Sequence, residues 1–180
     1  MLSVVSILTS LLLATASTTA GPMQARAGAC NPAVAGQGIN IVNGQFQLGY
    51  PSGDYFPNVP IEAEGLTVPL VPVFNVDPSG NGLLSIVDAP AGASPLYPTN
   101  VNRTQMLLEP RITAAPGNFT QGWSYVCSNC DDPTVAYGCE VVSDATGQCV
   151  QIGTAVGQPA SIAQCSGLPY GNQAFDIFIS

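Results

Sequence analysis

The stretch Gly147–Phe178 reads GQCVQIGTAVGQPASIAQCSGLPYGNQAFDIF and holds the clearest structural pattern in the chain. Two short runs typical of β-strands, Cys149–Ile152 and Ser161–Gln164, are separated by Gly and Pro residues. Such runs, bounded by turn residues, predict two strands joined by a turn. Cys149 starts the first run and Cys165 follows the second, 16 positions later (165 − 149), so we expect a disulfide across the pair.

The same stretch ends with Gln173 placed two residues before Phe175, at the head of a final alternating run. This arrangement resembles one subdomain of a ricin B-type lectin, in which a Gln-x-Trp or Gln-x-Phe step follows the second cysteine. The resemblance covers this stretch well and the rest of the chain loosely. It implies a β-trefoil fold and carbohydrate binding.

Similar steps recur earlier in the chain. Aromatic residues followed by short alternating runs stand at Phe74, Trp123 and Phe175, with spacings of 49 (123 − 74) and 52 (175 − 123). Gln121 precedes Trp123 as Gln173 precedes Phe175, whereas the first unit carries Pro72 at that position. Three units of similar length predict an internal repeat.

The fold we expect is all-β, a single disulfide-stapled β-trefoil over residues 28–180 in which the three aromatics pack near a pseudo-threefold axis. Two alternatives stay open. The aromatics can be three unrelated buried residues. Short strands with turn residues every eight to twelve positions also fit a β-sandwich.

Other segments give local predictions. Residues 38–48 alternate on both sides of Asn43-Gly44, a dipeptide that favours a two-residue primed turn in a hairpin. Pro51–Pro60 and Ala89–Asn100 are rich in Pro and small residues and are expected to be loops. No segment fits a long helix.

Composition excludes several partners. The chain has 180 residues, 46% of them hydrophobic, which suits one domain with one core. Charged residues make up 8%, with no Lys, no His and a net charge of −8. Binding to nucleic acid or to an anionic membrane needs a basic surface that three Arg residues do not provide.

The N-terminus suggests export. Residues 1–20 form an apolar start with a small-residue ending, which predicts a signal peptide, with further trimming possible up to residue 27. A signal-anchor is the alternative. We expect a secreted, extracellular protein, and the sequons at Asn102 and Asn118 agree with glycosylation in a secretory pathway.

Six cysteines in an oxidising compartment predict three disulfides. Beyond Cys149 and Cys165, the pairing of the remaining four is left open by the sequence: Cys30, Cys127, Cys130 and Cys139. Cys127-x-x-Cys130 followed by two further cysteines also has a zinc-like spacing, an alternative that a secreted chain without His disfavours. We predict no metal and no cofactor.

Catalytic groups are scarce. Without His or Lys, and with paired cysteines, no nucleophile has a base to activate it. Two carboxylate pairs remain, Glu62-x-Glu64 on one face of a strand and the adjacent Asp131-Asp132. Paired carboxylates can hydrolyse glycosides, but neither context holds one acid protonated, so we expect no enzyme.

The resemblance also implies where a sugar binds. In ricin-type units an Asp after the first cysteine, an aromatic before the second and the Asn before the Gln-x-Trp step form a shallow pocket. Here Asn172 and Gln173 match, while the Asp position holds Gln151 and the aromatic position holds Ala163. Tyr170 is the nearby ring that could stack on a sugar. The predicted ligand site is therefore Gln151, Tyr170, Asn172 and Gln173.

The function we expect is a monomeric, non-catalytic, lectin-like module that binds an unspecified glycan. One alternative is an extracellular interaction protein, such as a protease inhibitor or a small secreted effector, that uses the loops Pro51–Pro60 and Ala89–Asn100. The other alternative is a passive component of a cell wall or matrix.

Overall fold

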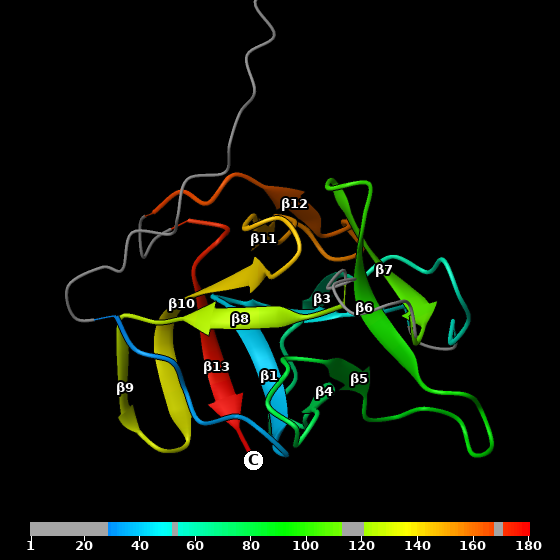
Figure 1. Cartoon of the computed structure of the whole chain (residues 1–180), viewed down its shortest axis with the longest axis horizontal. Coiled ribbons are helices and arrows are strands. Elements are labelled where there is room, and N and C mark those ends of the chain that lie inside the picture. Colours follow the sequence, from blue (N-terminus) through cyan, green and yellow to red (C-terminus); the bar gives the residue numbers. More distant parts are fainter. Residues whose placement is uncertain (1–28, 52–53, 113–120, 168–170) are drawn as a thin grey trace, which may run out of the picture.

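The computed structural model describes residues 29–51, 54–112, 121–167 and 171–180. These residues form strands, turns and loops without a helix, so the all-β prediction is confirmed (Figure 1). The thirteen strands are β1 Gly38–Asn43, β2 Phe46–Gly49, β3 Glu62–Gly65, β4 Phe74–Val76, β5 Leu84–Ile86, β6 Leu96–Val101, β7 Gln105–Pro110, β8 Trp123–Val126, β9 Asn129–Asp132, β10 Val135–Ser143, β11 Cys149–Gln151, β12 Ser161–Ala163 and β13 Phe175–Ile179.

The first hairpin forms where the alternating pattern predicts it, but its turn is shifted by one residue. Asn43 pairs with Phe46, so the two central residues of the turn are Gly44 and Gln45 and not Asn43 and Gly44. Gly44 has a φ of 60°, a value that glycine adopts without steric cost. The glycine thus sets the turn, and Asn43 donates from Nδ2 to the carbonyl oxygens of Gly171 and Ala174.

The loop predicted over Ala89–Asn100 is wrong in its second half, because β6 occupies Leu96–Val101. This strand pairs with β7 from Leu96 to Val101 despite Pro98 in its middle. β6 lies at one end of the strand order, and an edge strand tolerates the missing N–H of a proline.

Six strands form a closed circuit of antiparallel pairings. β1 pairs with β4, β4 with β5, β8 with β10, β10 with β13, and β13 with β1. A bridge between Leu83 and Gly122 joins the start of β5 to the start of β8 and completes the circuit. The sheet therefore curls until it closes on itself between β5 and β8.

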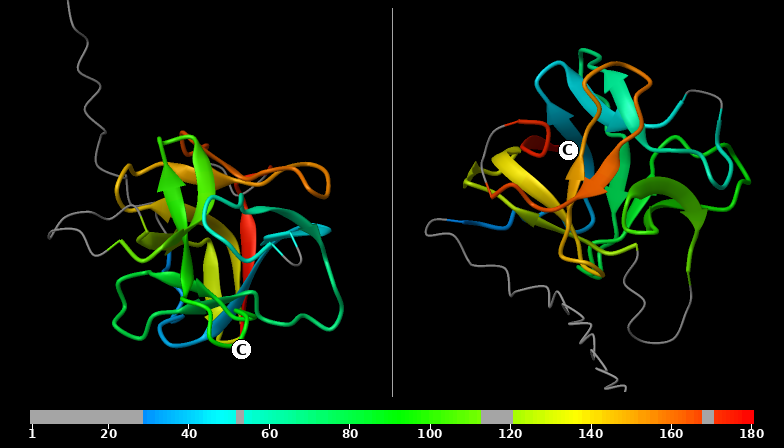
Figure 2. Two further views of the ribbon diagram at one scale, coloured as in Figure 1. Left: turned by 90° about the vertical axis from the view of Figure 1, so that its right-hand side faces the viewer. Right: turned by 90° about the horizontal axis from the view of Figure 1, so that it is seen from above.

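Three hairpins, β2–β3, β6–β7 and β11–β12, extend from this circuit. In Figure 1, β11 and β12 lie above β10 and β13. Single bridges connect the hairpins to one another or to their flanking residues: Pro60 with Leu107, Glu62 with Pro159, and Ser161 with Gln105. The hairpins therefore lie side by side, as the right-hand view of Figure 2 shows from above.

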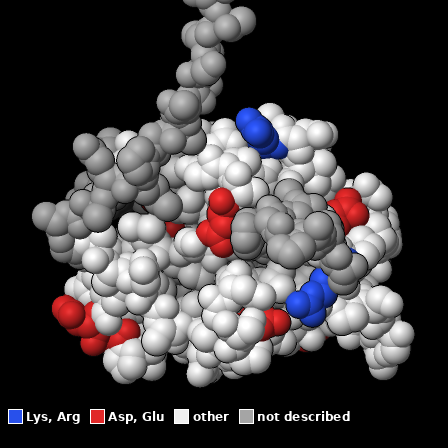
Figure 3. All heavy atoms as spheres, in the orientation of Figure 1, with Lys and Arg blue, Asp and Glu red and all other residues white. Residues whose placement is uncertain are grey.

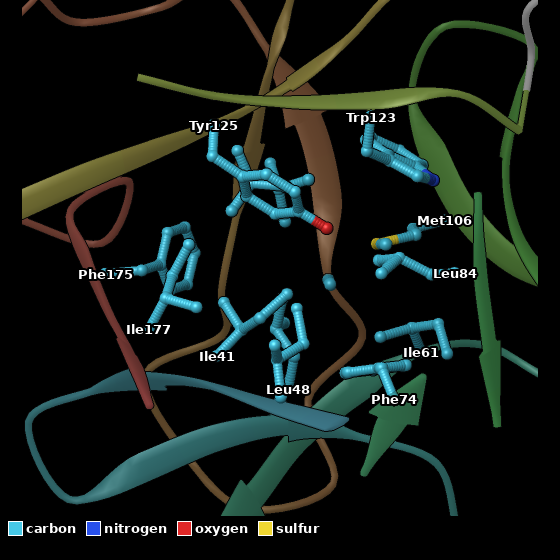
Figure 4. Close-up of a cluster of buried hydrophobic side chains, with 14 of the residues drawn as sticks. Ile41, Leu48, Ile61, Phe74, Leu84, Met106, Trp123, Tyr125, Phe175 and Ile177 are labelled. Atoms are coloured by element: carbon cyan, nitrogen blue, oxygen red, sulfur yellow. The ribbon is translucent and has the colours of Figure 1, made fainter. Parts of the chain in front are cut away.

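The core lies inside the circuit and under the hairpins. Phe74, Trp123 and Phe175 are each 1% exposed or less and each begins a strand of the circuit, β4, β8 and β13. Figure 4 shows these three side chains entering one hydrophobic cluster from different sides. The aromatic positions that the sequence singled out are thus equivalent in burial and in their place on a strand. The indole of Trp123 also donates from Nε1 to the carbonyl oxygen of Pro98, at 3.0 Å.

All six cysteines are paired. The predicted Cys149–Cys165 disulfide is confirmed. The other two bonds, which the sequence left open, are Cys30–Cys130 and Cys127–Cys139. The zinc alternative is wrong, because every thiol it requires is oxidised. Three disulfides are consistent with an extracellular protein.

The predicted signal peptide falls within residues 1–28, outside the described part of the chain. Within the described ranges, the structure has no helix long and apolar enough to cross a membrane.

Candidate functional site

The amide of Gln173 has a structural role. Its Oε1 accepts from the backbone N of Ser166 at 2.7 Å, and its Nε2 donates to the carbonyl oxygen of Gln164 at 3.0 Å. The side chain is 5% exposed. It ties the segment after β12 to the start of β13 and thereby satisfies two backbone groups.

Gln121 makes the same tie in the second unit. Its Oε1 accepts from Ile112 N at 2.9 Å and its Nε2 donates to Pro110 O at 2.9 Å, two residues apart just as Ser166 and Gln164 are. The Nε2 also donates to Thr99 Oγ1 at 2.9 Å. The two glutamines that precede aromatic residues are therefore equivalent, and both act on the backbone.

Only some of the other predicted ligand residues are shown to lie close together. Ile152 N donates to Asn172 O at 2.9 Å, which brings the ends of β11 and the segment before β13 together and places Gln151 near Asn172. Both side chains are half-buried, as is Ala163. Tyr170, the predicted stacking ring, lies outside the described residues.

The strand registers identify the corresponding positions in the first unit. Gln47 pairs with Glu64 in β2–β3 as Cys149 pairs with Ala163 in β11–β12. Counting from these pairs, Gly49 corresponds to Gln151 and Glu64 to Ala163. Val71 corresponds to Asn172, since each precedes its aromatic residue by three positions.

At these first-unit positions the structure has an open pocket with a volume of about 350 Å³, which we call the Tyr50 pocket. It lies between the outer face of β2–β3, the loop before β4 and the segment after β5. Its lining residues are Gln47, Gly49, Tyr50, Glu64, Thr67, Val71, Pro72, Val73, Ile86 and Asp88.

Glu64 lies flat across Gly49 in the wall of this pocket. A Cβ atom on residue 49 would be 2.6 Å from Glu64 Cγ, so only glycine leaves room for the carboxylate side chain. Glu62 lies on the same face of β3, two residues before Glu64. Burial and the negative charge of Glu62 raise the pKa of Glu64.

Tyr50 supplies the aromatic ring. It packs edge-on against Tyr55, with ring centroids 6.2 Å apart. Tyr55 is itself held in place, because its hydroxyl accepts from Leu96 N at 2.9 Å and donates to Ser94 O at 3.2 Å. Burial and the charge of Asp88 raise the pKa of Tyr50, so its phenol stays neutral at physiological pH.

Gln47 has an unpaired polar atom in this pocket. Its side chain is 8% exposed, and its Oε1 is buried without a hydrogen-bond partner. A buried carbonyl oxygen without a partner is unfavourable by about 1–3 kcal/mol, so such an atom indicates a missing ligand or water.

A larger hollow, of about 450 Å³, lies under residues 31–35 and beside β8. Two of its polar side chains are engaged within the protein, since Ser124 bonds to Asp144 and Asn81 Oδ1 accepts from Leu83 N at 3.2 Å, whereas the buried hydroxyl of Tyr125 has no partner. The Tyr50 pocket is smaller, but it alone of the two combines an aromatic ring, two carboxylates and the unpaired amide oxygen of Gln47.

Charged side chains are few on the surface of the molecule. Figure 3 shows one face of the molecule, on which a few acidic and basic side chains are scattered among uncharged residues. Among the described residues, no Arg lines the Tyr50 pocket, and the chain has no Lys. The pocket is therefore polar and acidic without a cationic partner.

Of the two predicted glycosylation sites, the structure describes one. Asn102 is exposed in the turn between β6 and β7, where it and Arg103 have φ values of 54° and 61°. Its modification stays a prediction. Asn118 lies outside the described residues.

Sequence reasoning missed the Tyr50 pocket because the first unit lacks both the glutamine and the cysteines that mark the third. The available signal was the pair Glu62-x-Glu64, which was noted only as a possible catalytic pair. Comparison of the chain with family models and with curated proteins found no match.

Proposed function

We propose that this protein is a secreted, non-catalytic β-trefoil that binds carbohydrate in the Tyr50 pocket. The trefoil is supported by the closed circuit of six strands, the three hairpins beside one another and the three buried aromatics at equivalent strand starts. A β-sandwich of two facing sheets does not need its first and last strands to pair, whereas β1 pairs with β13 here.

The single observation that carries the binding proposal is the composition of the pocket. A neutral phenol ring, the carboxylates of Glu64 and Asp88 and the amide of Gln47 line an open space. Carboxylate and amide oxygens accept hydrogen bonds from sugar hydroxyls, while an aromatic face covers the apolar C–H face of a sugar ring. A neutral glycan needs no cationic residue, and none of the described residues that line the pocket is cationic.

The carboxylates argue for binding without hydrolysis. Glu62 and Glu64 stand two residues apart on one face of β3, and Glu62 does not line the pocket. The pair therefore does not flank the open space in the way that the two carboxyl groups of a glycosidase flank the bond they cleave. The pocket is therefore proposed to hold a sugar and release it unchanged.

The test is a glycan-array screen of the mature, oxidised protein followed by titration of the best glycan. Tyr50→Ala removes the ring, and we expect it to weaken binding at least tenfold, about 1.4 kcal/mol. Tyr137→Ala is the matched control, because Tyr137 is 43% exposed on β10 and does not line the pocket. Asn172→Ala tests the site that the resemblance implies.

An array without a competable glycan would refute the function. Loss of binding in Asn172→Ala with unchanged binding in Tyr50→Ala would move the sugar to the third unit, near Gln151 and Gln173.

A second candidate function has one observation in its favour. The loops Pro51–Pro60 and Ala89–Asn100, chosen from the sequence as a possible protein-binding surface, are joined by the bonds of the Tyr55 hydroxyl to Ser94 and Leu96. Phe56 is 53% exposed beside this junction. A protease-inhibition assay tests this reading, with Phe56→Ala as the variant that should lose inhibition. A blank in both assays leaves the passive wall or matrix component.

A further inference from the structure

We propose that Glu62, Glu64 and Gln47 form a binding site for a divalent cation on the outer face of β2–β3, beside the Tyr50 pocket, and that Ca²⁺ is the ion it suits best. This goes beyond carbohydrate binding and stands without it, because the argument uses only the protein oxygens and their surroundings.

The carboxyl groups of Glu62 and Glu64 create the need for a positive charge. They project from the same face of β3, two residues apart, and are near enough to interact. Two carboxylates at this separation repel each other unless a proton or a cation lies between them. None of the described residues that line this pocket is an Arg, so they supply no cation of their own there.

Gln47 is an independent observation that points to a ligand at the same place. It lies directly opposite Glu64 in the β2–β3 ladder, where side chains of one face are about 5 Å apart at Cβ. It is more than nine-tenths buried, and its Oε1 has no hydrogen-bond partner. A cation beside Glu64 would give this oxygen the positive partner that the protein withholds.

Gly49 fixes the position of the ligand set. Because residue 49 has no Cβ, Glu64 can lie across the strand, where a Cβ would stand 2.6 Å from its Cγ. Gly49 also lies directly opposite Glu62 in the ladder. The glycine thus leaves room for the Glu64 side chain on the face of the ladder that also carries Glu62 and Gln47.

The donor atoms select the kind of ion. All three groups offer oxygen, and Ca²⁺ takes carboxylate, amide carbonyl and water oxygens in a flexible shell of six to eight. Zinc prefers nitrogen and sulfur donors, which this face does not contain. Three protein groups leave positions for water, so we expect a dissociation constant on the order of 10⁻⁴ to 10⁻³ M, as in extracellular calcium modules.

The experiment is isothermal titration calorimetry of the full, disulfide-intact protein with CaCl2, with MgCl2 as comparison. We expect one Ca²⁺ site in the wild type and weaker Mg²⁺ binding. The double variant Glu62→Gln, Glu64→Gln should weaken Ca²⁺ binding at least tenfold, and Gln47→Leu should weaken it by a smaller factor. Asp131→Asn with Asp132→Asn is the matched control, because it removes the same two negative charges from an exposed pair on β9.

A wild type without a Ca²⁺ isotherm overturns the site. So does a double variant that binds like the wild type, or a control that loses binding equally, since general charge would then explain the effect. Circular dichroism melts show that each variant is folded. Glycan titration in the presence of a chelator, run beside the Ca²⁺ titration without glycan, separates the two proposals. Sugar binding can fail while Ca²⁺ binding persists, and Ca²⁺ binding can fail while sugar binding persists.

Discussion

The first and third units use the same strand positions in opposite ways. In the third unit, Cys149 and Cys165 join β11 to the residue just after β12 through a disulfide. The corresponding residues of the first unit are Gln47 and Leu66, which follow from the pairing of Gln47 with Glu64 and of Cys149 with Ala163. Where the third unit has a covalent bond, the first has an unpaired amide beside an open pocket.

The tie after the hairpin differs as well. Gln173 fastens the third unit to its own backbone, whereas Pro72 stands at that position in the first unit and has no side-chain donor. The loop before β4 includes Val68, which is 86% exposed, and Val71, which is 56% exposed. The same backbone arrangement is therefore stabilised by internal side-chain bonds in the third unit. In the first unit those bonds are missing and the pocket stays open.

The largest expected effect comes from removing the disulfide that the first unit lacks. Cys149→Ser with Cys165→Ser opens a loop with a sequence separation of 16. We expect a loss of about 3 kcal/mol in the free energy of unfolding, because the unfolded chain regains its freedom. Urea denaturation measures it. A loss well below 1 kcal/mol would show that the third unit does not depend on its disulfide.

The glutamine ties should come next. Gln173→Ala and Gln121→Ala each leave buried backbone groups without partners, and we expect each to cost about 2 kcal/mol. Gln121 makes three bonds and Gln173 two, so Gln121→Ala should be the more damaging. Thermal melts of both variants measure the loss of stability, with the exposed Gln37→Ala as control. A larger loss in Gln173→Ala than in Gln121→Ala would contradict the ranking.

A transplanted disulfide tests the correspondence itself. Gln47→Cys with Leu66→Cys places two thiols at the positions that match Cys149 and Cys165. We expect them to oxidise, to stabilise the fold by on the order of 1 kcal/mol and to abolish ligand binding in the Tyr50 pocket. Thiol titration and a melting curve measure this. Free thiols in the folded variant would break the proposed correspondence of the two units.

The smallest effect concerns pH. The raised pKa of Glu64 means that the folded protein binds more protons than the unfolded chain just above the usual pKa of a glutamate. The free energy of unfolding should therefore fall as pH rises through this window. Glu64→Gln should flatten this fall and be the more stable form at neutral pH. Melts across pH in a chelator measure it, and an unchanged slope would rule out Glu64 as the cause.

Local patterns carried much of the fold. The strands around Gly44, Cys149 and Phe175 were predictable because alternation and turn residues act over a few neighbours. β6 was missed because Pro98 reads as a loop residue, and only its edge position makes a strand possible. The pairing of Cys30 with Cys130 spans 100 residues, a distance over which the sequence offers no local signal.

The candidate site was harder to predict for a related reason. Gln47 and Glu64 are ordinary polar residues of two short strands, and their meaning comes from the register that places them opposite each other. Gly49 gives no signal of its own until Glu64 lies across it. Gln173 carried the strongest motif in the sequence, yet its amide is used for the backbone. The motif that builds the fold and the pocket that we propose binds a ligand therefore occupy different units.

The pairing of β1 with β13 also bears on how the chain is made. β1 is synthesised early, but its partner across the circuit is the last strand of all, and Ser180 N donates to Gly38 O at 2.9 Å. Until that strand emerges, one edge of β1 has unpaired backbone groups, which are prone to pair with other chains. Closure thus depends on contacts between residues far apart in sequence, which form slowly. Folding in the cell should therefore finish only after β13 has been synthesised, and a chain truncated before Phe175 should aggregate.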